Sequence, residues 1–495
     1  MVTQLFSEQP LLSSKTGHTY LCMHGHFYQP PREDPFTGQL PNEPGAAPFA
    51  NFNEKITTEC YRPNADAGNF ESMSYDLGPT LASWLERSHP DVYRRILASE
   101  RRHMQRYGVS NALAQAYNHT ILPLANARDK RTQILWGLQD YRHRYGHDAH
   151  GMWLAETAVD IESLDIMAQS GITYTVLAPW QAATPIDCTE PYIVPLYNGC
   201  RMTVFFYNAP LSGGISFDWN VTNDADVFAS SYLPSHLVPD KSMNRESQLL
   251  LIATDGELYG HHKPWRDKFL NYLMNSGAPN CGFEVCSLER YMSMYPAIRE
   301  VRLHVPSAWS CAHGVARWNF GCSCTEGDSS WKGSLRMALV CLAGRSNLLF
   351  EQYTQDTLKD PWAARNDYLA LRNGWETLES FWGRHGKYAL TDEPSLKKAR
   401  QTQLLLEAQY YLQYSFTSCG FFFEDLDRIE PRNNIAFARR AISLIWQALA
   451  VDLQQDFVRD LQSTRSWRTQ LSGADLYRQL PAVSPDLLPP FSAEV

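Results

Sequence analysis

Three continuous apolar runs of the sequence end in side chains that can carry acid–base chemistry. These side chains are His24 and His26 after the first run, Glu156 after the second, and Asp255 and Glu257 after the third. A pair of carboxylates in one cleft is what glycoside hydrolysis needs, with one ionised as the nucleophile and one protonated as the general acid. Acidic residues that follow a strand also cap helices, and the pattern alone leaves both interpretations open.

The apolar runs have the pattern of strands in a parallel sheet. Residues 151–157 (GMWLAET), a helix that continues to Ser170 and residues 173–178 (TYTVLA) have the order and spacing of a βαβ unit. Residues 201–207 and 248–254 are further apolar runs, typical of strands that helices cover on both faces. Because ligands bind at the carboxyl ends of strands in such folds, we expect the polar side chains to converge there.

The pattern changes between about residues 300 and 330. From Trp331 onward it predicts helices over residues 331–355, 365–384, 395–414 and 433–461. We therefore predict an α/β fold with a catalytic domain over residues 19–310 and an α-helical domain over residues 311–480. An N-terminal tail (1–18) and a Pro-rich C-terminal tail (481–495) flank them.

Composition limits the expected partners and compartment. The 495 residues carry 44 Lys and Arg against 53 Asp and Glu, a net charge of −9, which argues against a nucleic-acid partner. No run approaches the ~18 apolar residues of a membrane span, and the first residues lack the pattern of a signal peptide. Eleven cysteines, an odd number in a long chain, favour reduced thiols. We expect a cytoplasmic protein without a membrane partner, and the sequence leaves its oligomeric state open.

Four segments, in this order, resemble the first four sequence regions of glycoside hydrolase family 57. They are HGHFYQPPRE (24–33), YNHTILPL (117–124), GMWLAETAVD (151–160) and ATDGELYGHH (253–262). The resemblance implies an incomplete (β/α)7 barrel followed by a helical domain, retaining chemistry on α-glucans, and no cofactor or catalytic metal. It also implies that Glu156 is the nucleophile, that Asp255 is the acid/base, and that His24, His26 and His119 contact sugar hydroxyls at the cleavage point.

The reaction expected from the resemblance is a double displacement. Glu156 attacks the anomeric carbon while Asp255 protonates the departing oxygen, which requires carboxyl groups about 5 to 5.5 Å apart. Entry of water gives α-amylase-like hydrolysis of α-1,4-glucans, which we prefer, whereas entry of a sugar hydroxyl gives a 4-α-glucanotransferase or a branching enzyme. Two alternatives remain open. They are a metal-dependent carbohydrate deacetylase that uses His24 and His26, and a catalytically silent glucan-binding protein.

Four tryptophans are candidate sugar contacts. Trp180, Trp219 and Trp309 lie in or beside irregular segments, where flat apolar rings can stack on sugars. Trp153 lies three residues before Glu156, so in an extended strand the two side chains face opposite ways. We expect core packing for Trp153 ahead of a sugar contact.

The residues that follow Asp255 are further candidates. Tyr259 and His261 are placed to contact sugar hydroxyls, although His261 also fits the start of a helix. Glu257 is expected to face away from Asp255 if the strand continues. If the strand ends instead, Glu257 can position Asp255 or His261.

A cluster of four residues has the ligand types of a zinc site. Cys311, His313, Cys322 and Cys324 offer thiolate and imidazole groups in tetrahedral number. Their C-x-H and C-x-C spacings are tighter than the usual C-x2-C pair. The alternative, which the sequence favours, is a loop whose small cysteines pack beneath the active site while His313 reaches into the cleft.

Overall fold

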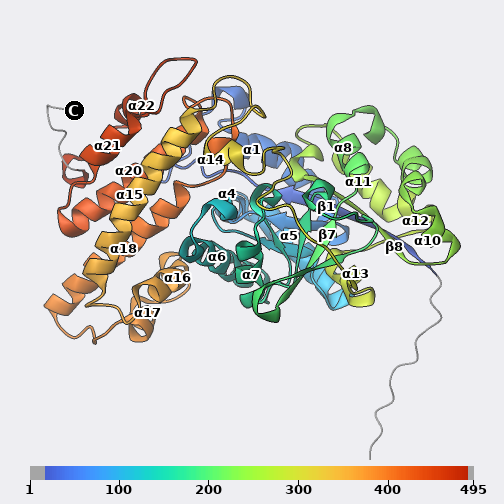
Figure 1. Cartoon of the computed structure of the whole chain (residues 1–495), viewed down its shortest axis with the longest axis horizontal. Coiled ribbons are helices and arrows are strands. Elements are labelled where there is room, and N and C mark those ends of the chain that lie inside the picture. Colours follow the sequence, from blue (N-terminus) through green and yellow to red (C-terminus); the bar gives the residue numbers. More distant parts are fainter. Residues whose placement is uncertain (1–16, 489–495) are drawn as a thin grey trace, which may run out of the picture.

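The computed structural model describes residues 17–488, so the parts of the predicted tails at residues 1–16 and 489–495 lie outside the described residues. The described chain has two parts that lie side by side (Figure 1). One part contains the sheets, and the other consists of long helices from the C-terminal third of the chain.

The first part is built around parallel strands that form an incomplete (β/α)7 barrel. Strands β8, β1, β2, β3 and β4 pair in that order, and β5 pairs in parallel with β7. A parallel bridge between Gly151 and Tyr174 joins the two sheets. The strands are β1 (Thr19–Phe27), β2 (Ser74–Leu77), β3 (Ala112–Gln115), β4 (Met152–Trp153), β5 (Tyr174–Leu177), β7 (Arg201–Phe206) and β8 (Gln248–Asp255). This confirms the predicted fold class.

Three shorter strands extend the sheets. β6 (Tyr192–Pro195) runs antiparallel to β7, β10 (Arg299–Glu300) pairs with β6, and β9 (Phe283–Val285) pairs with the start of β1.

Helices connect and cover the barrel strands. They include α1 (Phe52–Ile56), α2 (Arg62–Asp66), α3 (Asn69–Ser72), α4 (Pro79–Ser88), α5 (Pro90–Tyr107), α6 (Ala127–Tyr145), α7 (Ile161–Gln169), α8 (Ala209–Phe217), α9 (Ala225–Val227), α10 (Pro239–Met243), α11 (Arg266–Tyr272), α12 (Ala278–Asn280) and α13 (Leu288–Met294). The side chains of Asn126 and Asp160 cap the N-termini of α6 and α7. Gly137 lets α6 approach β3, because a Cβ there would lie 1.9 Å from the Gln115 carbonyl oxygen.

The C-terminal part is helical. It comprises α14 (Ala316–Asn319), α15 (Trp331–Thr354), α16 (Pro361–Arg372), α17 (Leu378–His385), α18 (Glu393–Tyr414), α19 (Cys419–Phe422), α20 (Ile429–Leu449), α21 (Gln454–Leu461) and α22 (Gly473–Gln479). Two predictions of a continuous helix were wrong. Residues 365–384 span α16 and α17, which a turn at Gly374 (φ 71°) separates, and residues 433–461 span α20 and α21, because Ala450 (φ 54°) ends α20.

The two parts share a hydrophobic core. Tyr117, Trp136 and Ala155 of the barrel belong to the same buried cluster as Leu339 of α15 and Tyr410 of α18. The helical part therefore packs directly on the barrel. None of the helices described here is long and apolar enough to cross a bilayer.

Candidate active site

The register of three neighbouring strands places His26 between two acids. Across β1 and β2, His26 pairs with Asp76, and across β1 and β8 it pairs with Asp255. Paired residues of adjacent strands point to the same face of a sheet. The three side chains therefore lie together at the carboxyl ends of the strands, the edge where ligands bind in such barrels.

Asp76 and His26 form a buried ion pair. Asp76 is fully buried and accepts hydrogen bonds from His26 Nδ1 (2.8 Å), from His24 Nε2 (3.0 Å) and from the Gln115 amide. Burial alone would raise the pKa of Asp76, but the charge of His26 and the hydrogen bonds from His24 and His26 together outweigh it and lower that pKa to about 2. Burial alone would lower the pKa of His26, but the Asp76 carboxylate raises it to about 9. His26 is therefore an imidazolium at neutral pH.

His119 is neutral and takes its orientation from both parts of the chain. Burial, together with the charge of His26, holds the pKa of His119 well below its usual value. Its Nε2 lies 3.2 Å from His26 Nε2 and accepts the proton of the imidazolium. Its Nδ1–H then donates to the Ser418 hydroxyl (2.6 Å), which belongs to the helical part. Tyr28 stacks on the His119 ring at 3.8 Å.

The histidine nitrogens are already engaged in hydrogen bonds. Burial lowers the pKa of His24, whose Nε2 contacts Asp76 and whose Nδ1 contacts Ser74 (3.1 Å). Both ring nitrogens of His26 and of His119 are paired as well. A metal held by these histidines, as the deacetylase alternative requires, would have to replace these bonds.

Glu156 lies in a strained turn directly after β4. Its backbone has φ 57°, a left-handed conformation that is costly for a residue with a Cβ and that is typical of functional sites. Its Oε2 accepts hydrogen bonds from the Trp309 indole (3.0 Å) and the Ser310 hydroxyl (2.6 Å). Burial raises the pKa of Glu156 and the nearby charge of Asp255 adds to the rise, whereas His26 opposes it.

Asp255 ends β8 with its side chain exposed. The surrounding protein still restricts its hydration and raises its pKa, while the positive charges of His26 and His262 oppose the rise. Glu257 lies in the loop that follows. It accepts hydrogen bonds from the Tyr61 hydroxyl (2.7 Å) and the Tyr28 backbone N–H (3.3 Å), and burial raises its pKa to about 7.

Three of the candidate sugar contacts have other partners. Trp153 is fully buried and stacks on the rings of His24 (4.8 Å) and His26 (5.2 Å), as core packing requires. Tyr259 is 1% exposed, and its hydroxyl accepts from Thr254. His261 Nδ1 pairs with Glu59 (2.5 Å).

The other candidate tryptophans are accessible. Trp180 and Trp219 are each about half exposed. Trp180 donates from its indole to the Ala308 carbonyl (3.3 Å), so it lies beside the loop that carries Trp309. Trp309 itself is partly buried, with its indole on Glu156.

Sequence reasoning missed several residues of this site. They are Asp76, Gln115, Ser310 and Ser418, together with Tyr28, Tyr61 and His262. Of these residues, only Asp76 could have been identified from a sequence pattern, because it is an acid in a short run (SYDL) that precedes a Gly-Pro turn. No sequence pattern indicates Ser418, because it lies about 300 positions from His119, the residue that it contacts.

Two known families match this chain. The profile described as glycosyl hydrolase family 57 matches residues 27–304, and a domain of unknown function (DUF3536) matches residues 328–488.

Curated relatives match part of the chain. An α-amylase of Pyrococcus abyssi is 25% identical over 251 residues, which is 47% of this chain and 36% of the relative. A 4-α-glucanotransferase of Thermococcus litoralis is 28% identical over 168 residues, 32% of this chain and 24% of the relative. The chain therefore spans about a third or less of the length of these relatives.

Solved structures share the fold over most of the chain. A maltose-forming amylase of Pyrococcus sp. ST04 has a TM-score of 0.71 at 13% identity, with 90% of this chain and 82% of that chain covered. A branching enzyme of Pyrococcus horikoshii has a TM-score of 0.60 at 14% identity, with 94% and 98% covered. At these identities the likeness concerns the fold alone.

Proposed function

The chain belongs to glycosyl hydrolase family 57, and from this premise we propose that it cleaves α-1,4-glucans by a retaining double displacement. Glu156 is the nucleophile and Asp255 is the acid/base. Neither step calls for a cofactor.

One observation carries the proposal. Glu156 follows β4, Asp255 ends β8, and both lie near His26. Asp255 pairs with His26 across β8 and β1, and the Trp309 indole that donates to Glu156 packs edge-on against the His26 ring, with 6.4 Å between the ring centroids. Glu156 keeps one carboxylate oxygen on Trp309 and Ser310, which leaves Oε1 for attack on the anomeric carbon. These two donors and the charge of His26 favour the ionised form that a nucleophile needs.

Asp255 is suited to transfer the proton. Restricted hydration raises its pKa, which favours the protonated form that passes its proton to the departing glycosidic oxygen. Its exposed side chain also reaches solvent, where the ionised form can activate the incoming water. Glu257 lies buried beside it, and burial together with the charge of Asp255 raises the pKa of Glu257 to about 7.

Hydrolysis is our preferred outcome, and transfer to a second glucan is the alternative. Transfer requires a surface that holds an acceptor sugar next to the glycosyl-enzyme. Trp180 offers such a surface, because it is 51% exposed and neighbours the loop of Trp309. A protein that binds glucans without turnover is the remaining candidate from the sequence.

The test is incubation with amylose and with maltooligosaccharides, followed by separation of the products by length and linkage. We expect shortened α-1,4 chains whose first-formed reducing ends are α anomers. Longer chains indicate transfer, new α-1,6 linkages indicate branching, and binding without products indicates the silent alternative. Glu156→Gln and Asp255→Asn should each lower kcat by at least ~10³-fold, whereas Glu59→Gln, which alters the partner of His261, serves as the matched control.

A further inference from the structure

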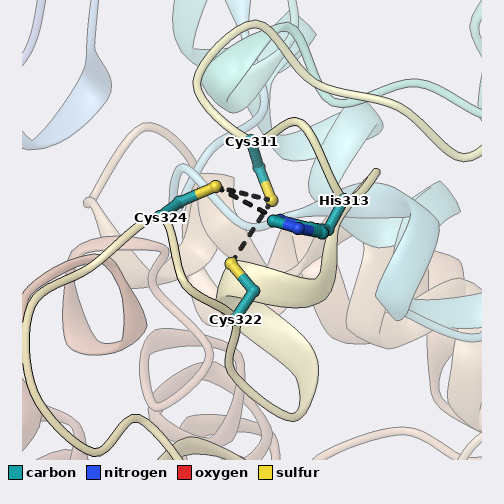
Figure 2. Close-up of side chains that lie close together, drawn as sticks. All are labelled: Cys311, His313, Cys322 and Cys324. Carbon is teal, nitrogen blue, oxygen red and sulfur yellow. Dashed lines mark hydrogen bonds between the residues drawn. The ribbon is translucent and has the colours of Figure 1, made fainter.

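Three cysteines and one histidine converge at the junction of the two parts of the chain. Figure 2 shows Cys311, His313, Cys322 and Cys324 with their side chains turned toward a common point. Their four ligand atoms all lie within 4.8 Å of one another. The Sγ atoms of Cys311 and Cys322 are 3.7 Å apart, those of Cys311 and Cys324 are 4.0 Å apart, and His313 Nδ1 is 3.4 Å from Cys324 Sγ.

These separations match the edges of a tetrahedron around one zinc ion. With a Zn–S distance of about 2.3 Å and a Zn–N distance of about 2.0–2.1 Å, tetrahedral geometry puts two sulfurs about 3.8 Å apart and a sulfur and a nitrogen about 3.6 Å apart. The three separations given above lie within about 0.2 Å of these values. The remaining pairs, all within 4.8 Å, need to close by about 1 Å at most. Its size accommodates a single ion and is too small to surround a cluster of several metals.

A disulfide explains the cluster less well. The Sγ atoms of Cys311 and Cys322 lie well beyond the bonding distance of about 2.05 Å. A disulfide between any two of the cysteines would also leave the third thiol and His313 without a role. All three cysteines are free.

The backbone of this loop is held in place by contacts of its own. Gly314 (φ 72°) and Gly321 (φ 90°) flank the ligands in left-handed conformations, and a Cβ at Gly321 would lie 2.3 Å from the Ser329 carbonyl oxygen. The Arg317 guanidinium donates to the Cys324 carbonyl (2.9 Å), and the Ser329 hydroxyl donates to the Cys322 carbonyl (3.2 Å). The four ligands are therefore directed inward before any ion binds.

Cationic side chains balance the charge that such a site would carry. One Zn²⁺ with three thiolates and a neutral imidazole has a net charge of −1. Arg317 lies on the ligand loop, and Lys332, fully buried, donates to Thr325 beside Cys324 and to the Phe422 carbonyl. These cations stabilise bound thiolates at a position that is only partly exposed.

We propose that Cys311, His313, Cys322 and Cys324 bind one structural Zn²⁺. The three thiols release their protons to solvent as the Zn–S bonds form, and His313 binds as the neutral imidazole through Nδ1. All four positions are filled by protein, which is the arrangement of structural rather than catalytic zinc. The geometry thus reverses the preference drawn from the sequence, because His313 faces the cysteines.

The proposed ion lies next to the residues that hold Glu156. Trp309 and Ser310, the two donors to its Oε2, directly precede the ligand Cys311. Cys322 and Cys324 lead into α15 of the helical part. The zinc would therefore fix the Trp309–Ser310 segment against Glu156 and tie it to the helical part. Any effect on turnover rests on the proposed function, whereas metal binding does not.

Metal analysis of the purified full-length protein under reducing conditions tests the site directly. We expect one zinc per chain, and replacement by Co²⁺ should give the intense thiolate-to-cobalt absorption of a tetrahedral, thiolate-rich site. Cys324→Ser should lose the zinc and lower Tm. Cys281→Ser, an exposed cysteine outside the cluster, should retain one zinc per chain with unchanged Tm.

The zinc content of the unmodified protein tests the proposed site even if the ligand variants fail to fold. Absence of bound zinc after incubation with Zn²⁺, a Cys311–Cys322 disulfide in reduced preparations, or one equivalent of another metal would each overturn the assignment. Removal of zinc with a chelator should lower kcat more than it raises KM, because a displacement of about 1 Å at a reacting group can cost ~10²-fold. Zinc loss with kcat unchanged would overturn the link to Glu156 while leaving the metal site in place.

Discussion

Among the residues of the site, His26 has the largest influence on the charges of its neighbours. It is charged because Asp76, buried behind it, raises its pKa to about 9. Its charge in turn opposes the rise in the pKa values of Glu156 and Asp255. The Asp76–His26 ion pair therefore acts on both proposed catalytic groups.

Removing this charge should shift the pH dependence of turnover. In His26→Asn, the pKa values of Glu156 and Asp255 should both rise, so both limbs of the kcat/KM profile should move to higher pH. The basic limb should move further, because His26 is the first of the charges that act on Asp255. His143→Asn, which alters a histidine stacked on Trp375, is the control. If both limbs of the kcat/KM profile stay at the wild-type pH, or move to lower pH, the role of His26 is contradicted.

Asp76 should stabilise the fold within a defined pH window. Its folded-state pKa of about 2 lies below the ordinary value of 3.8, so its contribution is present above pH ~4 and is lost as the pH falls toward 2. His26, raised from 6.5 to about 9, contributes fully below pH ~6.5 and loses that contribution as the pH rises through 9.

Asp76→Asn should therefore lower the free energy of unfolding by about 3–5 kcal/mol at pH 5–6, since it leaves a buried charge unpaired. Urea titrations at pH 5.5 and at pH 3 measure this. The difference between variant and wild type should be smaller at pH 3. A difference that grows on acidification would show that the pair does not stabilise the fold.

Site residues could be predicted from the sequence only where they follow an apolar run typical of a buried strand. Glu156 and Asp255 follow apolar runs that mark the ends of buried strands. Asp76 also lies near the carboxyl end of a buried strand, β2. However, β2 is only four residues long, and no apolar run distinguishes it in the sequence. Its importance comes from pairing with β1, which is a tertiary property.

Strand β4 is shorter than the strand that its sequence pattern predicts. The apolar run at residues 151–157 predicted a strand, whereas the strand covers only Met152–Trp153 and the chain then enters a left-handed turn. Local patterning gives no indication of this turn, because Glu156 is not a residue that favours positive φ. Contacts of its carboxylate with the Trp309–Ser310 segment accompany the strained conformation.

The segment between α18 and α19 supplies a partner for His119. Ser418→Ala removes the acceptor of His119 Nδ1–H, so the imidazole can move its proton to Nε2, where it would face the N–H of His26. We expect kcat/KM to fall about tenfold, while the free energy of unfolding falls by only ~1 kcal/mol.

Ser415→Ala is the matched control. Ser415 is also buried in this segment, but its hydroxyl donates locally to the Leu412 carbonyl. Steady-state kinetics and urea titration of both variants separate the two effects. Equal losses of kcat/KM in the two variants would show that Ser418 has no specific influence on His119.

At the scale of the whole molecule, the barrel and the helical part share one core. Trp136 of α6 is fully buried, and its indole donates to the Arg365 carbonyl of α16 (3.1 Å). The sequence predicted both parts, because period and composition change along the chain. It could not predict their contact, because each buried residue fits the core of its own part equally well.

The shared core predicts a single cooperative unfolding transition. Trp136→Ala should lower the free energy of unfolding by about 3–5 kcal/mol and shift the whole transition to lower temperature. Phe217→Ala, at a side chain that is 89% exposed, should change it by less than ~0.5 kcal/mol. Differential scanning calorimetry gives the result. Two transitions, of which only one moves, would show that the parts unfold independently.

Azide rescue tests whether Glu156 is the nucleophile opposite Asp255. Glu156→Gly removes the nucleophile and leaves space for azide on the face of the sugar from which Glu156 attacks. With an activated α-glucosyl substrate, we expect azide to restore turnover and the product to be the β-glycosyl azide, as determined by NMR. An α-glycosyl azide, or wild-type turnover by Glu156→Gly without azide, would contradict it.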